Sequence, residues 1–155
     1  GDYDDHPEVV LGILNDVAEG YTTDPNRVYL TGLSRGAHAS WNLIEKLPNT
    51  FAATVPIGGS PDFDKLDAFR NTAVWVAHNL GDPTVEWEDA DKGAKAIEKA
   101  IDIEFDRYSV PMPELEQIAE TDYLFTQPKL DRHDAWTELY TSTTFYKWLL
   151  AHSLE

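Results

Sequence analysis

The chain has 155 residues, 42% of them hydrophobic and 26% charged, which is enough for one domain with a substantial apolar core. Twelve basic and 28 acidic residues give a net charge of −16, which would repel nucleic-acid phosphates and anionic lipids. The chain has no cysteine and no run approaching the roughly 18 apolar residues of a membrane span. We therefore expect no nucleic-acid partner, no membrane partner and no cysteine nucleophile.

The first predicted element is a helix. Asp5 and Glu8 have the spacing of a capping box, and Gly20 stands where a C-terminal glycine is common. Between them, apolar side chains recur at helical spacing, at Val9, Val10, Ile13, Leu14, Val17 and Tyr21. The pattern predicts an amphipathic helix over residues 6–19.

A strand, a sharp turn and a second helix follow. Residues 28–33 are rich in β-forming side chains without polar alternation, which is typical of a strand buried on both faces. Ser34 comes directly after this run. From Gly36 the apolar residues return at helical spacing until Pro48 ends the pattern. The serine is therefore predicted to lie at a strand-to-helix turn.

The same alternation continues to the end of the chain. The remaining predicted elements are strands over 51–57, 73–77 and 123–126, a helix marked by Ala90, Ala94, Ile97 and Ile101, and a closing helix over 136–151 with Tyr140, Thr144, Trp148 and Ala151 on one face. Residues 102–121, with one or two helical turns at 114–119, are predicted to be an insertion. We predict a single domain over residues 1–155, of the α/β class, with a mainly parallel sheet and helices on both faces.

The motif Gly32-Leu33-Ser34-Arg35-Gly36 points to a chemical function. A G-x-S-x-G motif between a strand and a helix is typical of a nucleophile elbow, in which a tight turn lifts the serine hydroxyl above the sheet. Glycines on both sides leave room for a crowded backbone. The helix that follows directs its N–H groups and its positive end at an oxyanion on the substrate. We therefore predict Ser34 as a nucleophile.

A serine nucleophile requires an acid and a histidine, which in this motif class follow it in that order. Asp82 lies in the loop after the predicted strand 73–77, and such loops collect functional groups in open α/β sheets. Asp62, Asp64 and Asp89 are competing acids, and an aspartate before a proline is also common in turns. Because Asp82 alone follows a buried strand directly, we predict it as the acid that orients the base.

Five histidines could act as the base. His6 precedes the serine motif, and His152 is near the end of the last predicted helix. His38 lies one helical turn beyond the serine, and His78 lies at a strand end, where histidines are more often structural. His133 comes after the last predicted strand and just before the closing helix, in the required chain order. We predict His133 as the general base.

The stretch from Asp24 to Ser34 resembles bacterial α/β-hydrolase esterases of the feruloyl-esterase and polyhydroxyalkanoate-depolymerase-like group. Residues 51–59, 78–85 and 133–136 resemble the later strand, the acid loop and the histidine loop of that group, in the same order. The resemblance covers most of the chain. It implies an α/β-hydrolase-like fold that lacks the N-terminal strands and corresponds to the C-terminal, catalytic half.

The resemblance implies that Ser34, Asp82 and His133 form the triad of a serine esterase that cleaves carboxylic esters through an acyl-enzyme. It implies a small-molecule or polysaccharide-linked ester as substrate, and it favours a secreted or periplasmic location. No histidine and carboxylate cluster has the spacing of metal ligands, so we expect no metal and no cofactor. Trp136 is a candidate substrate-binding residue, as are the aromatic residues of 102–125, with ordinary packing as the alternative.

Two features depart from the pattern of that group. Arg35 is followed by Gly36 and Ala37, where the group more often has an uncharged residue followed by two glycines. The group also has several strands before the serine motif, including a loop that donates one oxyanion-hole N–H. Nothing upstream of Ser34 can be that loop. The sequence offers only the N–H of Arg35, and losing one such donor typically costs about 10²- to 10³-fold in rate.

Three explanations for the absent strands stay open. The chain is a fragment, a second chain completes the sheet, or the domain is reduced and has weak or no catalysis. An uncovered strand at 28–33 would be a bare sheet edge, which proteins normally pair or protect, and this favours a missing or partnering segment. Two further hypotheses stay open: a noncatalytic binding or interaction domain, and a peptidase that uses the same triad.

Overall fold

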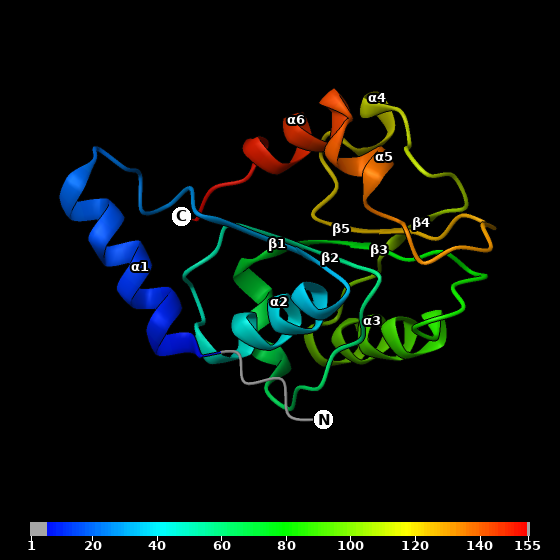
Figure 1. Ribbon diagram of the computed structural model, residues 1–155, viewed down its shortest axis with the longest axis horizontal. Helices are drawn as coiled ribbons and strands as arrows, with labels where there is room; N and C mark the ends of the chain where they lie inside the picture. Colours follow the sequence, from blue (N-terminus) through cyan, green and yellow to red (C-terminus); the bar gives the residue numbers. More distant parts are fainter. Residues whose placement is uncertain (1–5, 155) are drawn as a thin grey trace.

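The computed structural model describes residues 6–154 (Figure 1). Its strands are β1 (Tyr29–Leu33), β2 (Ala53–Ile57), β3 (Ala73–Ala77), β4 (Asp106–Tyr108) and β5 (Tyr123–Thr126). Its helices are α1 (Pro7–Gly20), α2 (Arg35–Lys46), η1 (a 3₁₀ helix, Leu66–Asn71), α3 (Trp87–Ile101), α4 (Leu115–Ile118), α5 (Thr137–Tyr140) and α6 (Thr143–Ala151). The strands form one sheet in the order β1-β2-β3-β5-β4, and all adjacent pairs are parallel.

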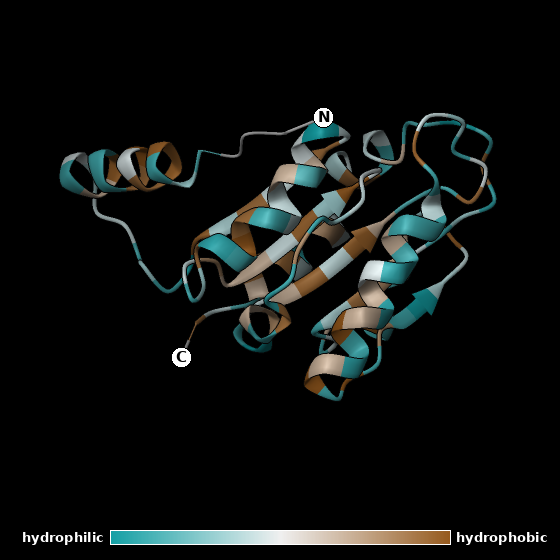
Figure 2. Cartoon of the chain, turned by 90° about the horizontal axis from the view of Figure 1, so that it is seen from below, coloured by the Kyte–Doolittle hydropathy of each residue, from teal (hydrophilic) through white to brown (hydrophobic). Residues whose placement is uncertain are grey.

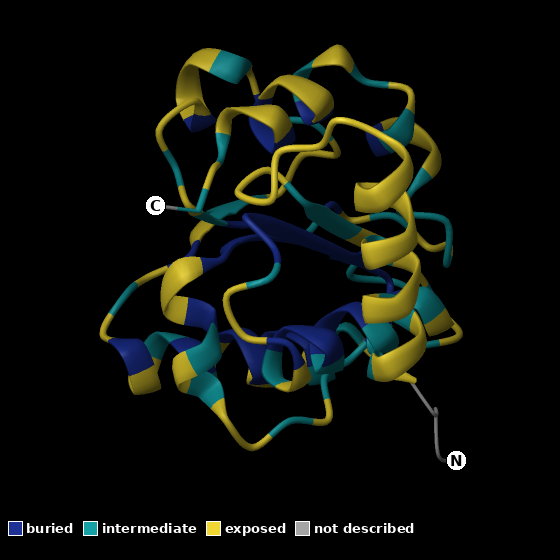
Figure 3. Cartoon of the chain, turned by 90° about the vertical axis from the view of Figure 1, so that its left-hand side faces the viewer, coloured by how far each residue is buried: buried dark blue, intermediate teal, exposed yellow. Residues whose placement is uncertain are grey.

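Helices cover both faces of this sheet, as predicted. Helices α2, α3 and η1 lie on one face, and α4, α5 and α6 lie on the other (Figure 1). Every residue of β2 and β3 is buried between the two layers (Figure 3), which explains why these strands read as continuous apolar runs. Each face has its own core: the first includes Trp41, Phe69, Ile97 and Phe125, and the second includes Trp75, Leu124, Phe145 and Trp148.

The predicted closing helix over 136–151 is wrong in one respect, because the structure has two helices there. Helix α5 ends at Tyr140, and Ser142 caps α6 by accepting a hydrogen bond from the N–H of Thr144 at 3.2 Å. Of the predicted apolar face, Trp148 is buried and Tyr140 packs partly on the second core, whereas Ala151 is exposed. The side chains of this region that are buried against the sheet are Leu139, Phe145, Trp148 and Leu149.

The segment 102–121, predicted as an insertion, contributes a strand that the sequence analysis did not identify. Strand β4 pairs with β5 at the outer edge of the sheet, and its three residues are too few and too polar to show an apolar pattern. Arg107 of β4 forms ion pairs with Asp91 at 2.7 Å and Glu98 at 3.2 Å, both on α3. The predicted helical turn is α4. That the whole segment is an insertion stays a prediction.

Helix α1 has the predicted extent but little packing. Only Val10 and Leu14 of its apolar stripe pack on the core. The other apolar residues, Val9, Leu11, Ile13, Val17 and Tyr21, are 39% to 75% exposed. The helix lies apart from the sheet (Figure 2), beyond the β1 edge (Figure 1). None of the described helices, α1 included, has the length and apolar character needed to cross a membrane.

The ends of α1 differ from the predicted ones. Asp5, the first member of the predicted capping box, lies outside the described residues. The N-cap position is taken by His6, whose side chain does not cap the helix. Gly20 is the last helical residue, and Tyr21 beyond it is extended, so the helix ends without a left-handed glycine.

Strand β1 lies at the edge of the sheet, and the prediction that the run 28–33 is buried on both faces is wrong, because the residues of β1 are half-buried or exposed. The N–H of Ser34 donates to the carbonyl of Ile57 at 2.8 Å, and the carbonyl of Val28 accepts from Ala52 at 2.8 Å, so these residues face β2. Because backbone groups alternate along a strand, Tyr29, Thr31 and Leu33 present theirs to the outer side. Among the strands of residues 6–154, none pairs with that side.

Candidate active site

Ser34 lies at the turn between β1 and α2. Its φ of 52° and ψ of −113° are values that residues with a side chain rarely adopt. The N–H of Ser34 is bound to Ile57 of β2, and its carbonyl accepts hydrogen bonds from Ala37 at 3.0 Å and His38 at 3.2 Å. The turn is therefore held from the sheet and from the first turn of α2, at the carboxyl end of the strands.

The two glycines of the serine motif have different roles. A Cβ atom at Gly32 would overlap the backbone of Gly36, because strand and helix cross closely at this point. A Cβ atom at Gly36 would meet nothing within 4 Å. The expectation that both glycines are needed for space is wrong for Gly36. The backbone also comes close to Ser34 at Gly59, after β2, because a Cβ atom added there would lie 2.8 Å from the carbonyl oxygen of Ser34.

The structure brings the three predicted site residues together. His133 Nε2 lies 2.9 Å from Ser34 Oγ, and His133 Nδ1 lies 2.7 Å from Asp82 Oδ2. The three side chains come from the loops that follow β1, β3 and β5, whose carboxyl ends meet at one edge of the sheet. With the carboxylate as acceptor, His133 carries its proton on Nδ1, and Nε2 can accept the hydroxyl proton of Ser34.

The Asp82 carboxyl is fully buried and strongly hydrogen-bonded. Its Oδ1 accepts from the N–H groups of Thr84 at 2.8 Å and Val85 at 3.1 Å. Burial alone would raise the pKa of Asp82, but the hydrogen bonds from His133, Thr84 and Val85 lower it below 3.8 overall. The acid is therefore a carboxylate at neutral pH, as a residue that orients a neutral imidazole must be.

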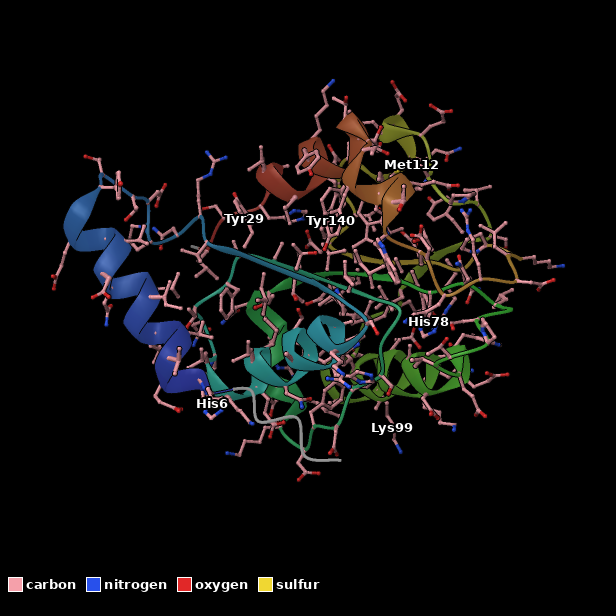
Figure 4. The ribbon with its side chains drawn as sticks, in the orientation of Figure 1. His6, Tyr29, His78, Lys99, Met112 and Tyr140 are labelled. Carbon is pink, nitrogen blue, oxygen red and sulfur yellow. The ribbon has the colours of Figure 1, made fainter. Side chains whose placement is uncertain are left out.

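A second imidazole lies beside this carboxylate. His78, at the carboxyl end of β3 (Figure 4), is completely buried, and its Nε2 lies 3.0 Å from the carbonyl oxygen of Val85 and 3.3 Å from Asp82 Oδ2. Burial lowers the pKa of His78 below 6.5, and the Asp82 carboxylate only partly opposes this effect. His78 is therefore neutral and supports the Asp82 loop.

The other candidates from the sequence lie elsewhere. His38 is bound to Ser60, with its Nδ1 2.6 Å from the carbonyl oxygen, and His152 Nδ1 lies 2.9 Å from the carbonyl oxygen of Trp148. His6 lies on the exposed first turn of α1, where its Nδ1 is 3.2 Å from Glu8. No hydrogen bond joins the competing acids to an imidazole among the described residues; these acids are Asp62, Asp64 and Asp89.

Arg35 begins α2, and its backbone N–H makes no hydrogen bond with another described residue. This N–H and the positive end of the 12-residue helix are available to an oxyanion formed beside Ser34. Between residues 6 and 33 the structure has only α1, β1 and the segment that joins them, which enters β1 at its amino end. This part of the chain therefore supplies no second donor.

Trp136 contacts the predicted base directly. Its ring meets the His133 imidazole edge to face, with centroids 5.1 Å apart, and part of it packs on the second core. The aromatic residues of the 102–125 region behave differently. Phe105 and Tyr123 pack against each other at 5.6 Å, in agreement with ordinary packing. Within residues 6–154, no three His, Asp or Glu side chains gather as they would around a metal ion.

One polar residue of the site was missed by the sequence analysis. Asn79 lies two positions after the end of β3 and is buried, and its amide contacts the loop that carries His133. The available signal was a polar residue two positions beyond a buried strand, in the same loop as Asp82.

The chain is similar to several esterases. It is 37% identical over 49 residues to the poly(3-hydroxyalkanoate) depolymerase C of Paucimonas lemoignei. It is 27% identical over 79 residues to the bifunctional acetylxylan esterase/xylanase XynS20E of Neocallimastix patriciarum. These matches cover 32% and 51% of this chain. Among solved structures, a thermostable esterase matches with a TM-score of 0.75 and 25% identity over 94% of the chain. No protein-family model matches.

These similarities show an α/β-hydrolase fold of the esterase group and support ester hydrolysis in general. The matched relatives are much longer than this chain. The chain covers 36% of the thermostable esterase and 12% of each of the two curated relatives.

We predict that Gly32→Ala disrupts the turn that presents Ser34, because its Cβ atom would meet backbone that cannot move aside. Gly36→Ala is a matched control in the same motif, since its Cβ atom enters open space and alanine favours the helix. Thermal unfolding should show a loss of several degrees or more for Gly32→Ala and no loss for Gly36→Ala. Equal melting temperatures for the two variants would contradict the steric argument.

We also predict that the buried His78 makes the fold less stable in mild acid. Because the pKa of His78 in the folded chain is lowered below 6.5, the unfolded chain takes up the proton first as the pH falls. The free energy of unfolding should therefore decline once the pH drops below about 6.5. His78→Gln should decline less steeply. Urea unfolding between about pH 8 and pH 5 measures both slopes, and identical slopes would refute the assignment.

Proposed function

We propose that this chain is the catalytic half of a serine esterase that cleaves carboxylic esters through an acyl-enzyme. The observation that carries the proposal is the continuous hydrogen-bonded series from Ser34 Oγ through the His133 imidazole to the Asp82 carboxylate. The strained turn at Ser34 supports it, and so does the N–H of Arg35, which makes no hydrogen bond with any residue of 6–154. The general likeness to esterases agrees with it.

In the proposed reaction His133 Nε2 removes the proton of Ser34 as Oγ attacks the ester carbonyl. The Arg35 N–H donates to the oxyanion that develops on the former carbonyl oxygen. His133, now carrying a proton on both nitrogens, is stabilised by Asp82 and transfers the Nε2 proton to the departing alcohol. Water, activated by the same imidazole, then releases the carboxylic acid and restores the hydroxyl of Ser34.

The substrate is proposed to be a small-molecule or polysaccharide-linked ester. The two curated relatives are named for acetylxylan and for poly(3-hydroxyalkanoate), both of which contain carboxylic ester bonds. Trp136, whose ring lies against His133, is positioned to contact the part of the substrate next to the scissile bond.

We further propose that the sheet continues beyond β1 and that the added segment supplies the second oxyanion donor. The outward backbone groups of Tyr29, Thr31 and Leu33 pair with no strand of residues 6–154, and proteins normally pair or protect such an edge. Helix α1, several of whose apolar residues are exposed, lies beyond the same edge (Figure 1). This segment belongs either to a longer polypeptide that includes this chain or to a second chain.

The triad is tested with a fluorophosphonate probe and with p-nitrophenyl acetate. The wild type should be labelled, and Ser34→Ala should lose labelling and at least about 10⁴-fold in turnover. Ser153→Ala is the matched control, because this serine is exposed and lies at the opposite end of the sheet, and it should behave as the wild type. If the wild type shows neither labelling nor turnover, the result favours a noncatalytic module. Faster cleavage of amide than ester analogues would favour a peptidase.

The sheet extension is tested by amide hydrogen exchange along β1. In the 155-residue chain, the N–H groups of Thr31 and Leu33 should exchange faster than those of Leu30 and Gly32, which face β2 and serve as internal controls. In the protein isolated from its source, all four should be protected. Rapid exchange of Thr31 and Leu33 in both preparations would refute the extension and support a reduced domain.

A further inference from the structure

The acid loop and the histidine loop are joined by backbone hydrogen bonds. The N–H of Leu80 donates to the carbonyl of Pro128 at 2.9 Å, and the N–H of Gly81 donates to Leu130 at 3.1 Å. Gly81 permits this approach, because a Cβ atom there would overlap Asp131. These bonds hold the histidine loop up to residue 130. They do not reach the residues on either side of the predicted base.

Asn79 makes that connection. Its side-chain Nδ2 donates to the carbonyl of Arg132 at 2.8 Å and to the carbonyl of Asp134 at 3.1 Å, which are the carbonyls on both sides of His133. Asn79 is 1% exposed, so water does not compete for these bonds. Two carbonyl acceptors require the NH₂ group on this side of the amide, and the orientation of the side chain is therefore determined by chemistry.

Two attachments restrain the backbone more than one would. A single hydrogen bond to one neighbour of His133 would leave the loop free to rotate about it, whereas bonds to both neighbours limit the rotation of the peptide units that flank the imidazole. His133 must reach Ser34 at 2.9 Å and Asp82 at 2.7 Å at the same time. Misplacement of a reacting group by about 1 Å can cost about 10²-fold in rate.

We propose that Asn79 is a positioning residue that holds the His133 imidazole in line between Ser34 and Asp82. The proposal rests on the proposed esterase function and adds to it a residue outside the triad. Asn79 touches no reacting atom. It acts through the backbone of the histidine loop, and its effect should appear in the rate of the chemical step rather than in substrate binding.

The test compares Asn79→Ala with Thr72→Val. Thr72 stands at the other end of β3, is also buried, and donates one hydrogen bond to the carbonyl of Phe51 at 2.9 Å. Its replacement removes a buried side-chain to carbonyl bond without touching the site. Asn79→Ala should lower kcat for p-nitrophenyl acetate by about 10- to 100-fold and leave KM within about twofold. Thr72→Val should lower the melting temperature by about as much as Asn79→Ala does, but it should leave kcat and KM unchanged.

A second measurement does not depend on turnover. The proton on His133 Nδ1, bound to Asp82, should give a downfield resonance in the proton NMR spectrum of the wild type and of Thr72→Val, and this resonance should broaden or disappear in Asn79→Ala. If Asn79→Ala does not fold, Asn79→Ser, which keeps one donor, takes its place, with an intermediate kcat expected. A folded Asn79 variant with wild-type kcat and an unchanged resonance would overturn the proposal.

The outcomes separate this inference from the proposed function. A wild type without labelling or turnover would refute the esterase proposal, while the His133 resonance would still report whether Asn79 positions the imidazole. An active wild type whose Asn79 variants keep the full rate and the resonance would refute only the role of Asn79.

Discussion

The parallel pairing of β1, β2, β3 and β5 is the constraint on which the rest of the structure depends. Because these strands run in the same direction, the loops after β1, β3 and β5 emerge at one edge, and residues 34, 82 and 133 meet there although 99 positions separate the first from the last. Pairing within the sheet also holds the unusual backbone of Ser34, since its N–H is bound to β2. The chemistry of the site therefore depends on hydrogen bonds made several residues away from it.

Two sets of hydrogen bonds hold the His133 imidazole in place, one through Asp82 and one through the histidine loop. Asp82 binds His133 on one side and is itself fixed by two backbone N–H groups and flanked by the neutral His78. The histidine loop is held by the backbone of the acid loop and by Asn79. This arrangement makes the acid loop the support for both of the groups that act on Ser34.

The sequence predicted a strand most accurately where a buried apolar run lies between polar loops. Strands β3 and β5 have the predicted bounds because both are buried runs between polar loops. Strand β4 was missed because it has only three residues and because Arg107 is held by ion pairs with α3, which no local pattern shows. The break between α5 and α6 was missed for a different reason: Ser142 is a local N-cap signal, but the residues on both sides of it were assigned to one helical face.

For the site, chain order and motif spacing were sufficient to select Ser34, Asp82 and His133 as candidates, and the structure places them in contact. The different needs of Gly32 and Gly36 could not be read from the motif, because they depend on how closely β1 and α2 cross. The role of Asn79 was equally hidden. It depends on backbone carbonyls more than 50 positions away, and because every residue has such a carbonyl, the sequence does not indicate which ones Asn79 contacts.

The open β1 edge has a further consequence for the behaviour of the chain at high concentration. In a chain whose β1 edge has no partner beyond residues 6–154, these strand groups and the exposed apolar residues of α1 would form a template on which identical chains can add. The net charge of −16 opposes this by mutual repulsion, whose range shrinks from about 10 Å at 0.1 M salt to about 3 Å at 1 M. High ionic strength is therefore expected to favour edge-to-edge association of such chains over separate chains.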